Sequence, residues 1–144
     1  VIEERAAHRP PLVSGVGVRL PSHLTATGRA ILSALPRNQV RALYPNRQAF
    51  TDRTGIGPKS PKELEATLAE TQRTGFAEEH GDVTPGFDSY AVAVRDYNDF
   101  PIAGLALTFV SGSLRPEQER SLKTKLRLAG TELSRRLGAV GSLT

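Results

Sequence analysis

Residues 20–32 read LPSHLTATGRAIL and provide the reference point for the rest of the chain. Pro21 and Ser22 interrupt any preceding strand, and Thr25 is a candidate N-cap for a helix that runs to about Leu35. The first turn of this helix, residues 26–28, holds only small side chains, which leave its backbone N–H groups accessible. Because such groups and the helix dipole attract anions, the stretch would suit a carboxylate or phosphate. From the spacing alone, an ordinary capped helix with a hydrated first turn is the favoured interpretation.

The composition limits the classes of protein to which the chain can belong. With 144 residues it is expected to form one domain around one core, and it contains no Cys, Met or Trp. The lack of Cys excludes a disulfide framework, a thiol nucleophile and any Cys-based metal site. No stretch approaches the length of a membrane span and no signal peptide opens the chain, so we expect no membrane association and a cytoplasmic location.

The chain is basic, with a formal net charge of +4, which raises the possibility of nucleic-acid binding. However, the basic residues are scattered, and the densest set is mixed with glutamates in the last 30 or so residues. No recognition helix, zinc finger or aromatic RNA-binding motif accompanies them. The pattern therefore favours a solvated basic face. A basic nucleic-acid-binding module remains the alternative, and it predicts DNA binding with steep salt dependence.

Three further helices are predicted after the first. A short one lies between Pro36 and Pro45. The clearest starts at Ser60, where Ser60 is the N-cap, Pro61 occupies the first position and Glu63 completes a capping box. Its predicted buried face consists of Leu64, Leu68 and Thr71, and Gly75 ends it. The last begins at Pro116 and ends at Gly138, with one apolar stripe formed by Leu122, Leu126, Ala129, Leu133 and Leu137.

Five segments have the character of strands, and the residues between them read as turns or loops. The strands are expected at Val1–Arg5, Leu12–Arg19, Phe76–Gly81, Asp88–Asp96 and Phe100–Val110. The last two form a hairpin around residues 97–99 and are apolar on both faces, which suggests central strands of a covered sheet. Asn46–Lys59 reads as a loop or arm. The order of elements predicts an α+β domain with a central antiparallel sheet flanked by helices.

A cluster of charged residues, Glu78–Asp82, raises the question of metal binding and catalysis. Along a strand Glu78, His80 and Asp82 point to one face and Glu79 to the other. Three such ligands could hold a cation, and a small metal-assisted hydrolase is the alternative that this cluster suggests. No HExxH or GxSxG motif supports it, and a solvated edge of charges is the simpler interpretation. We therefore predict no enzyme, no cofactor and no metal.

Four short motifs, taken together, resemble one protein family. Pro21–Ala30, Arg73–Asp82, Tyr90–Val94 with the preceding Gly86, and Gly104–Thr108 are similar, in the same order, to segments of the effector-binding domain of IclR-type bacterial transcription regulators. Each motif is weak alone, but four in register over roughly residues 1–138 make a specific match.

The resemblance implies a GAF-like sensor fold with a regulatory role. Residues 1–144 would be the ligand-sensing and oligomerisation domain. A winged helix-turn-helix DNA-binding domain would precede it, because the chain opens without Met and as if inside a strand. The implied partners are a small effector, a carboxylate or an aromatic acid, and DNA through the missing domain rather than through this fragment. A homodimer or homotetramer is expected, and repressor and activator roles are both open.

The resemblance also implies an effector site between the sheet and the start of the first helix. Carried over by position, its polar and small residues are Ala26, Thr27, Glu79, Ser89, Ala106 and Thr108. An apolar wall could be lined by Leu24, Leu32, Tyr90 and Leu107. Ser89 and Thr108 could donate hydrogen bonds to a carboxylate, whereas Glu79 would have to be protonated or accept from a hydroxyl. The alternative is that Ser89 and Thr108 are ordinary strand residues with local partners.

Overall fold

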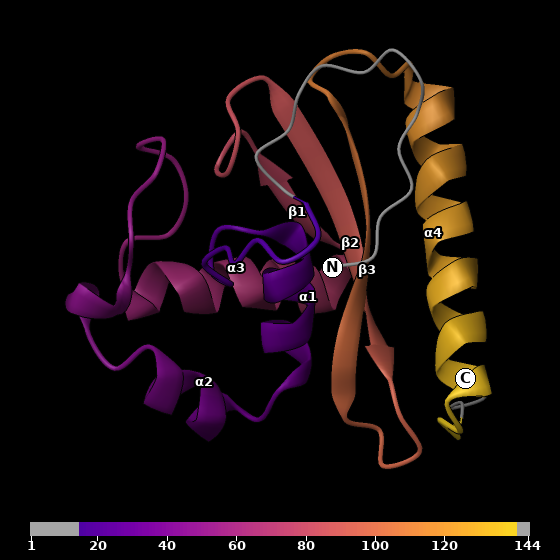
Figure 1. The fold of residues 1–144 in the computed structure, drawn as a ribbon, viewed down its shortest axis with the longest axis horizontal. Helices are drawn as coiled ribbons and strands as arrows, with labels where there is room; N and C mark the ends of the chain where they lie inside the picture. Colours follow the sequence, from indigo (N-terminus) through magenta and orange to yellow (C-terminus); the bar gives the residue numbers. More distant parts are fainter. Residues whose placement is uncertain (1–14, 141–144) are drawn as a thin grey trace.

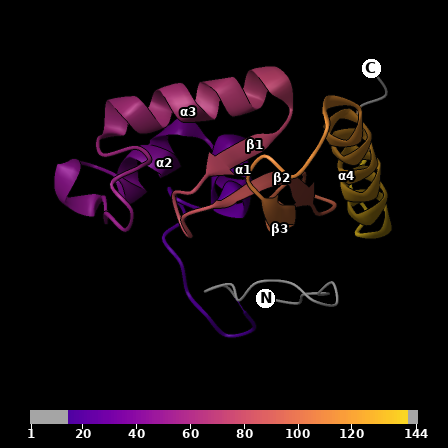
Figure 2. The same cartoon turned by 90° about the horizontal axis from the view of Figure 1, so that it is seen from above.

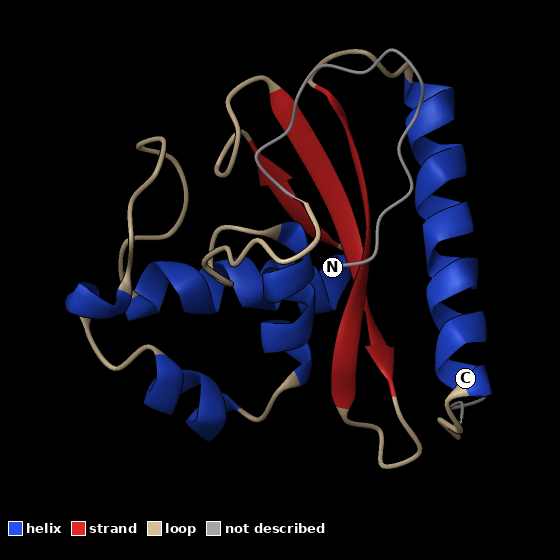
Figure 3. Ribbon diagram, in the orientation of Figure 1, coloured by secondary structure: helices blue, strands red, loops and turns tan. Residues whose placement is uncertain are grey.

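The structure, a computed structural model, describes residues 15–140 (Figure 1). Figure 3 distinguishes its helices, strands and loops. The elements in chain order are α1 (Ala26–Ala34), α2 (Arg37–Leu43), the short 3-10 helix η1 (Arg47–Ala49), α3 (Pro61–Thr74), β1 (Ala77–His80), β2 (Phe87–Arg95), β3 (Pro101–Val110) and α4 (Pro116–Arg136).

The elements form three layers with the sheet in the middle. The strands are antiparallel in the order β1-β2-β3. Helices α1, α2 and α3 lie on one side of the sheet and α4 lies alone on the other, as Figures 1 and 2 show from two directions. This arrangement confirms the predicted α+β class with an antiparallel sheet between helices. Within residues 15–140, no helix has the length and apolar character needed to cross a bilayer.

The two faces of the sheet differ in the size of their side chains, because successive residues of a strand point to opposite faces. On the first face, Ala77 and Ala91 pack against Ala26 and Ala30 of α1. The opposite face carries large side chains, and its buried cluster against α4 consists of Phe76, Tyr90, Val92 and Leu126. The small residues on the first face allow α1 to approach the sheet closely.

Helix α1 starts where the sequence predicts. Thr25 is the N-cap, and its hydroxyl accepts a hydrogen bond of 3.0 Å from the N–H of Gly28. Two glycines make room for this start. A Cβ atom on Gly28 would lie 2.3 Å from the Ser22 carbonyl oxygen, and one on Gly104 of β3 would lie 2.9 Å from Cβ of Thr27. The turn before α1 and the adjacent strand therefore both contact the helix backbone directly.

Helix α3 confirms its predicted boundaries and buried face. The Ser60 hydroxyl accepts from the N–H of Glu63 at 3.3 Å, and Leu64, Leu68 and Thr71 are buried. Gly75 ends the helix in the left-handed conformation, with φ 78°. The capping box differs by one residue, since the Glu63 carboxylate accepts from the N–H of Lys59 rather than from that of Ser60.

The predicted apolar stripe of α4 is wrong in its second half. Leu126 is buried, but Leu133 and Leu137 are 40% and 44% exposed, and Ala129 is exposed. The line of contact runs instead through Gly130, where an added Cβ would lie 2.5 Å from a methyl carbon of Val92. Four residues further on, the Ser134 hydroxyl accepts from the N–H of Arg95 at 3.0 Å. The missing side chain at Gly130 thus sets which side of α4 meets the sheet.

The N-terminal strands cannot be compared in full with the structure. Val1–Arg5 and residues 12–14 lie outside the described residues, and residues 15–19 form a turn, with Gly17 at φ 85°, instead of a strand. Within residues 15–140, β2 pairs on both sides but β3 pairs only with β2. The prediction of two central strands therefore holds there for β2 alone, and Ile102 on β3 is 49% exposed.

We expect Gly28→Ala to destabilise the protein, although alanine is normally favoured over glycine in a helix by about 1 kcal/mol. The added methyl would collide with backbone atoms of Ser22, which cannot rotate away as a side chain can. Overpacking of this kind costs about 1–3 kcal/mol. Denaturant unfolding measures the change.

The exposed Ala66→Gly substitution in α3 serves as the control, because it reports the ordinary helix preference in this protein. It should lower stability slightly. A Gly28→Ala protein as stable as the wild type would contradict the close contact between the helix and the turn.

Candidate functional site

A row of three polar residues crosses all three strands on the face that carries α1. Glu79 of β1 is paired with Ser89 of β2, and Ser89 with Thr108 of β3. The Ser89 hydroxyl donates to Oε1 of Glu79 at 2.8 Å and lies 2.9 Å from the Thr108 hydroxyl. Since Ser89 has one proton and gives it to Glu79, Thr108 is the donor to Ser89. The row is therefore one connected hydrogen-bond chain.

Glu79 is the buried end of this chain. Its side chain is in contact with little solvent, and Oε2 accepts from the N–H of Asp82 at 3.0 Å. Burial raises the pKa of Glu79, and the hydrogen bonds from Ser89 and from the Asp82 N–H oppose this shift without cancelling it. The other end of the chain, Thr108, is exposed.

The N-terminus of α1 lies next to this row. Ala26 packs on Ala77 and Ala91, the row of small residues adjacent to the polar one, and Thr27 contacts Gly104. Among residues 15–140, no oxygen accepts a hydrogen bond from the N–H groups of Ala26 and Thr27. The N–H of Gly28, in contrast, donates to the Thr25 hydroxyl. Two backbone donors at the positive end of a helix dipole suit a carboxylate.

The structure brings together six of the ten residues predicted for the site. These are Ala26, Thr27, Glu79, Ser89, Ala106 and Thr108, which come from α1 and from one face of the sheet. The four predicted wall residues lie elsewhere or deeper.

The predicted apolar wall needs correction. Tyr90 and Leu107 lie on the opposite face of the sheet, against α4, because each directly neighbours a residue that faces α1. Leu32 packs between α1, α2 and α3. Leu24 is fully buried beneath Gly57, where an added Cβ would lie 2.8 Å from it.

A buried ion pair that sequence reasoning missed connects α1 to the end of β1. Arg29 and Asp82 have almost no exposed side-chain surface, and the Arg29 guanidinium donates to the Asp82 carboxylate. The same guanidinium donates to the carbonyl oxygens of His23 at 2.8 Å and Glu78 at 2.6 Å. The second Asp82 oxygen accepts from the N–H of His80 at 3.0 Å. All these bonds hold the start of α1 beside Glu79.

His23 has a structural role in the turn before α1. It is fully buried, its Nε2 lies 2.9 Å from the carbonyl oxygen of Thr51, and its ring packs edge-on against Tyr44 and Phe50. Burial lowers the pKa of His23, so the ring is neutral and Nε2 carries the proton that Thr51 accepts. The contact fastens the Asn46–Lys59 arm to the turn.

The Glu78–Asp82 cluster is divided between two environments. Glu78 and His80 face α4, where Glu78 pairs with Lys123 at 2.8 Å, while Asp82 turns toward Arg29. Burial lowers the pKa of His80, but its Glu78 and Asp88 partners more than offset this and raise it above the ordinary value. In the part of the chain that the structure describes, no three His, Asp or Glu side chains are grouped to hold a metal ion.

Comparison with known proteins places the chain among bacterial regulators. The family model described as Bacterial transcriptional regulator IclR C-terminal matches residues 2–135. The HTH-type transcriptional regulator XynR of Escherichia coli is 30% identical over 125 residues, which cover 87% of this chain and 49% of XynR. The glycerol operon regulatory protein of Streptomyces coelicolor is 32% identical over 130 residues, or 86% of this chain and 48% of that protein.

A solved structure agrees with these matches. The crystal structure of the repressor BlcR from Agobacterium tumefaciens aligns with a TM-score of 0.82 and 30% sequence identity, over 91% of this chain and 52% of the BlcR chain. This chain therefore spans about half the length of the two curated relatives, 49% and 48%.

We expect Asp82→Asn to be strongly destabilising. The substitution keeps the shape of the side chain but leaves the Arg29 charge buried without a partner, which costs about 3–5 kcal/mol. Chemical denaturation checks the size of the loss. Glu70→Gln, which removes the carboxylate of the exposed Glu70–Arg73 pair, is the matched control and should leave stability unchanged. An equal change in stability in Asp82→Asn and Glu70→Gln would contradict the larger cost expected at the buried pair.

A further prediction concerns the pH dependence of stability that Glu79 causes. Because its pKa is raised in the folded state, the folded protein binds the proton more tightly than the unfolded chain does. This contribution is fully present below the ordinary pKa of 4.5 and is lost as the pH rises through the raised value. Glu79→Gln removes the titration, so the variant should gain stability relative to the wild type as the pH increases.

Unfolding of both proteins from about pH 4 to about pH 8 measures this difference, and the comparison cancels the other titrating groups. A stability difference that stays constant over that interval would contradict the raised pKa of Glu79.

Proposed function

The chain belongs to the IclR family of bacterial transcriptional regulators, and we propose that it is the domain through which such a regulator senses a small organic acid. The relatives are regulators rather than enzymes, which confirms the expectation that the chain is not an enzyme. The resemblance to this family and the α+β, GAF-like fold predicted from it are likewise confirmed.

The observation that carries this proposal is a pair of backbone donors at the start of α1, without an acceptor among residues 15–140, beside a connected polar row. A ligand carboxylate would accept from the N–H groups of Ala26 and Thr27. A hydroxyl group on the ligand would then donate to the exposed Thr108 oxygen, since the Thr108 proton is already donated to Ser89. Ala106 leaves room between the two, since its side chain is a single methyl group.

Glu79 favours a ligand that also carries a hydroxyl group. An ionised Glu79 would repel a carboxylate, whereas a hydroxyl could donate to it through the row. The raised pKa of Glu79 reduces the repulsion, because a neutral carboxyl carries no negative charge. Hydroxy acids, including hydroxybenzoates, therefore fit the site better than simple dicarboxylates do.

We further propose that DNA binding resides in a helix-turn-helix domain outside these residues. The chain covers about half of each curated relative, and XynR is named as an HTH-type regulator. Some basic side chains of the described region are paired within the chain: Arg135 and Arg136 share Glu132, and Arg73 pairs with Glu70. Such pairing reduces the charge that these three side chains offer to DNA phosphates.

The sensing role requires that the ligand distinguish two states of the regulator. A ligand shifts an equilibrium only by its difference in affinity for the two arrangements. We propose that these are two arrangements of subunits in a cytoplasmic homodimer or homotetramer, which would change the spacing of the DNA-binding domains.

The experiment that tests this function is a thermal-shift screen of the chain against keto acids, hydroxybenzoates and dicarboxylates. A ligand at a hundredfold its dissociation constant adds about 2.7 kcal/mol of stability, which raises the melting temperature by several degrees. The hit should lose up to about tenfold in affinity in Thr108→Val, because the oxygen that accepts from the ligand hydroxyl is removed.

Thr124→Val on the exposed surface of α4 is the matched control, since it removes a hydroxyl far from the site, and it should leave affinity unchanged. A hit that binds Thr108→Val as tightly as the wild type would move the ligand away from the polar row. Nanomolar, operator-specific DNA binding by these 144 residues alone would contradict the proposed division of roles.

A further inference from the structure

A hollow lies between α1, α2 and α3, on the side of α1 that faces away from the sheet. It has a volume of about 430 Å³ and shares no residue with the polar row. Its lining residues from α1 and α2 include Leu32, Val40 and Arg37, and those from α3 include Lys62 and Leu68. We call this hollow the helical groove. Its volume is within the range of pockets that bind one small molecule.

The floor of the helical groove is apolar. Leu32, Val40, Leu64 and Leu68 form one buried cluster there. Leu35 and Tyr44 are partly buried against the same cluster and remain accessible from the groove. An apolar ligand segment placed on this floor would remove hydrocarbon surface from water at roughly 25 cal/mol per Å².

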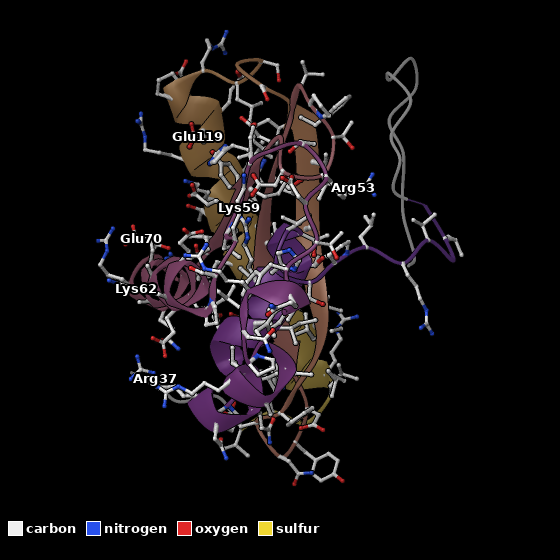
Figure 4. All side chains as sticks on the ribbon, turned by 90° about the vertical axis from the view of Figure 1, so that its left-hand side faces the viewer. Arg37, Arg53, Lys59, Lys62, Glu70 and Glu119 are labelled. Carbon is white, nitrogen blue, oxygen red and sulfur yellow. The ribbon has the colours of Figure 1, made fainter. Side chains whose placement is uncertain are left out.

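The rim of the helical groove is cationic. Arg37 and Arg41 come from α2 and Lys62 comes from α3, against a single carboxylate, Glu65. Glu65 is already paired with Arg41 at 3.1 Å. Within residues 15–140, Arg37 and Lys62 take part in no ion pair, and Figure 4 shows both projecting on the same side of the molecule. The rim therefore offers two positive charges beside an apolar floor.

We propose that the helical groove binds an amphipathic monoanion, specifically an aliphatic carboxylic acid of medium chain length, as a site separate from the one at the start of α1. The hydrocarbon chain lies over the buried cluster, on the partly exposed Leu35 and Tyr44, and the carboxylate lies between Arg37 and Lys62. The positive rim selects against organic cations.

The test is a titration of the ¹⁵N-labelled chain with octanoate, followed by amide chemical shifts. Saturable shifts are expected at Val40, Leu68 and Ala69, which line the groove. Octylammonium has the same chain with the opposite charge and should produce no such shifts. Shifts confined to Thr27, Ser89 and Thr108 would overturn the proposal, because octanoate would then occupy the site at the start of α1.

Two variants separate charge from shape. Arg37→Gln combined with Lys62→Gln should weaken octanoate about five- to tenfold, the effect of losing two partly exposed ion pairs. Ala69→Phe places a ring in the groove from an exposed helix position and should abolish binding.

The control for net charge is Arg120→Gln with Lys125→Gln on the exposed surface of α4, which should leave octanoate affinity unchanged. Equal weakening by both pairs of substitutions, or full affinity in Ala69→Phe, would overturn the site. None of these substitutions touches the polar row. A negative result for the helical groove therefore leaves the proposed sensing site unaffected, and a negative result in the thermal-shift screen leaves the helical groove unaffected.

Discussion

The structure depends most directly on the buried ion pair between Arg29 and Asp82, whose residues are 53 positions apart in the chain. A buried ion pair is weak evidence for extra stability, since desolvation of both charges offsets their attraction. Its effect here is geometric. The guanidinium binds the turn before α1 through the carbonyl oxygen of His23 and binds β1 through that of Glu78. The start of the helix and the buried carboxylate of Glu79 are thereby held in one fixed relation.

Sequence reasoning succeeded where the determinant is local. The caps at Thr25 and Ser60 and the left-handed Gly75 are decided within a few residues, so their patterns predicted the ends of α1 and α3 correctly. It failed where the structure of an element depends on a residue far away in the sequence. Nothing within α4 reveals that Val92 needs the space at Gly130, and that space decides which leucines of α4 are buried.

The candidate site shows the same division. The residues that face α1 follow from the resemblance and lie together, whereas the expectation for Tyr90 and Leu107 rests on their apolar character and neglects alternation along a strand. The role of Arg29 follows from neither argument. One signal was available: a charged residue between Gly28 and Ala30 on a helix face otherwise made of small residues implies a buried partner.

The alternation of side chains on β2 has a mechanical consequence. Ser89 belongs to the polar row on the α1 face, and the next residue, Tyr90, donates from its hydroxyl to Glu119 of α4 at 2.6 Å on the other face, with Lys123 above its ring. A planar peptide bond joins the two residues. Ser89 and Tyr90 therefore cannot move independently, so a displacement of β2 on the α1 face would also displace the contact between Tyr90 and α4.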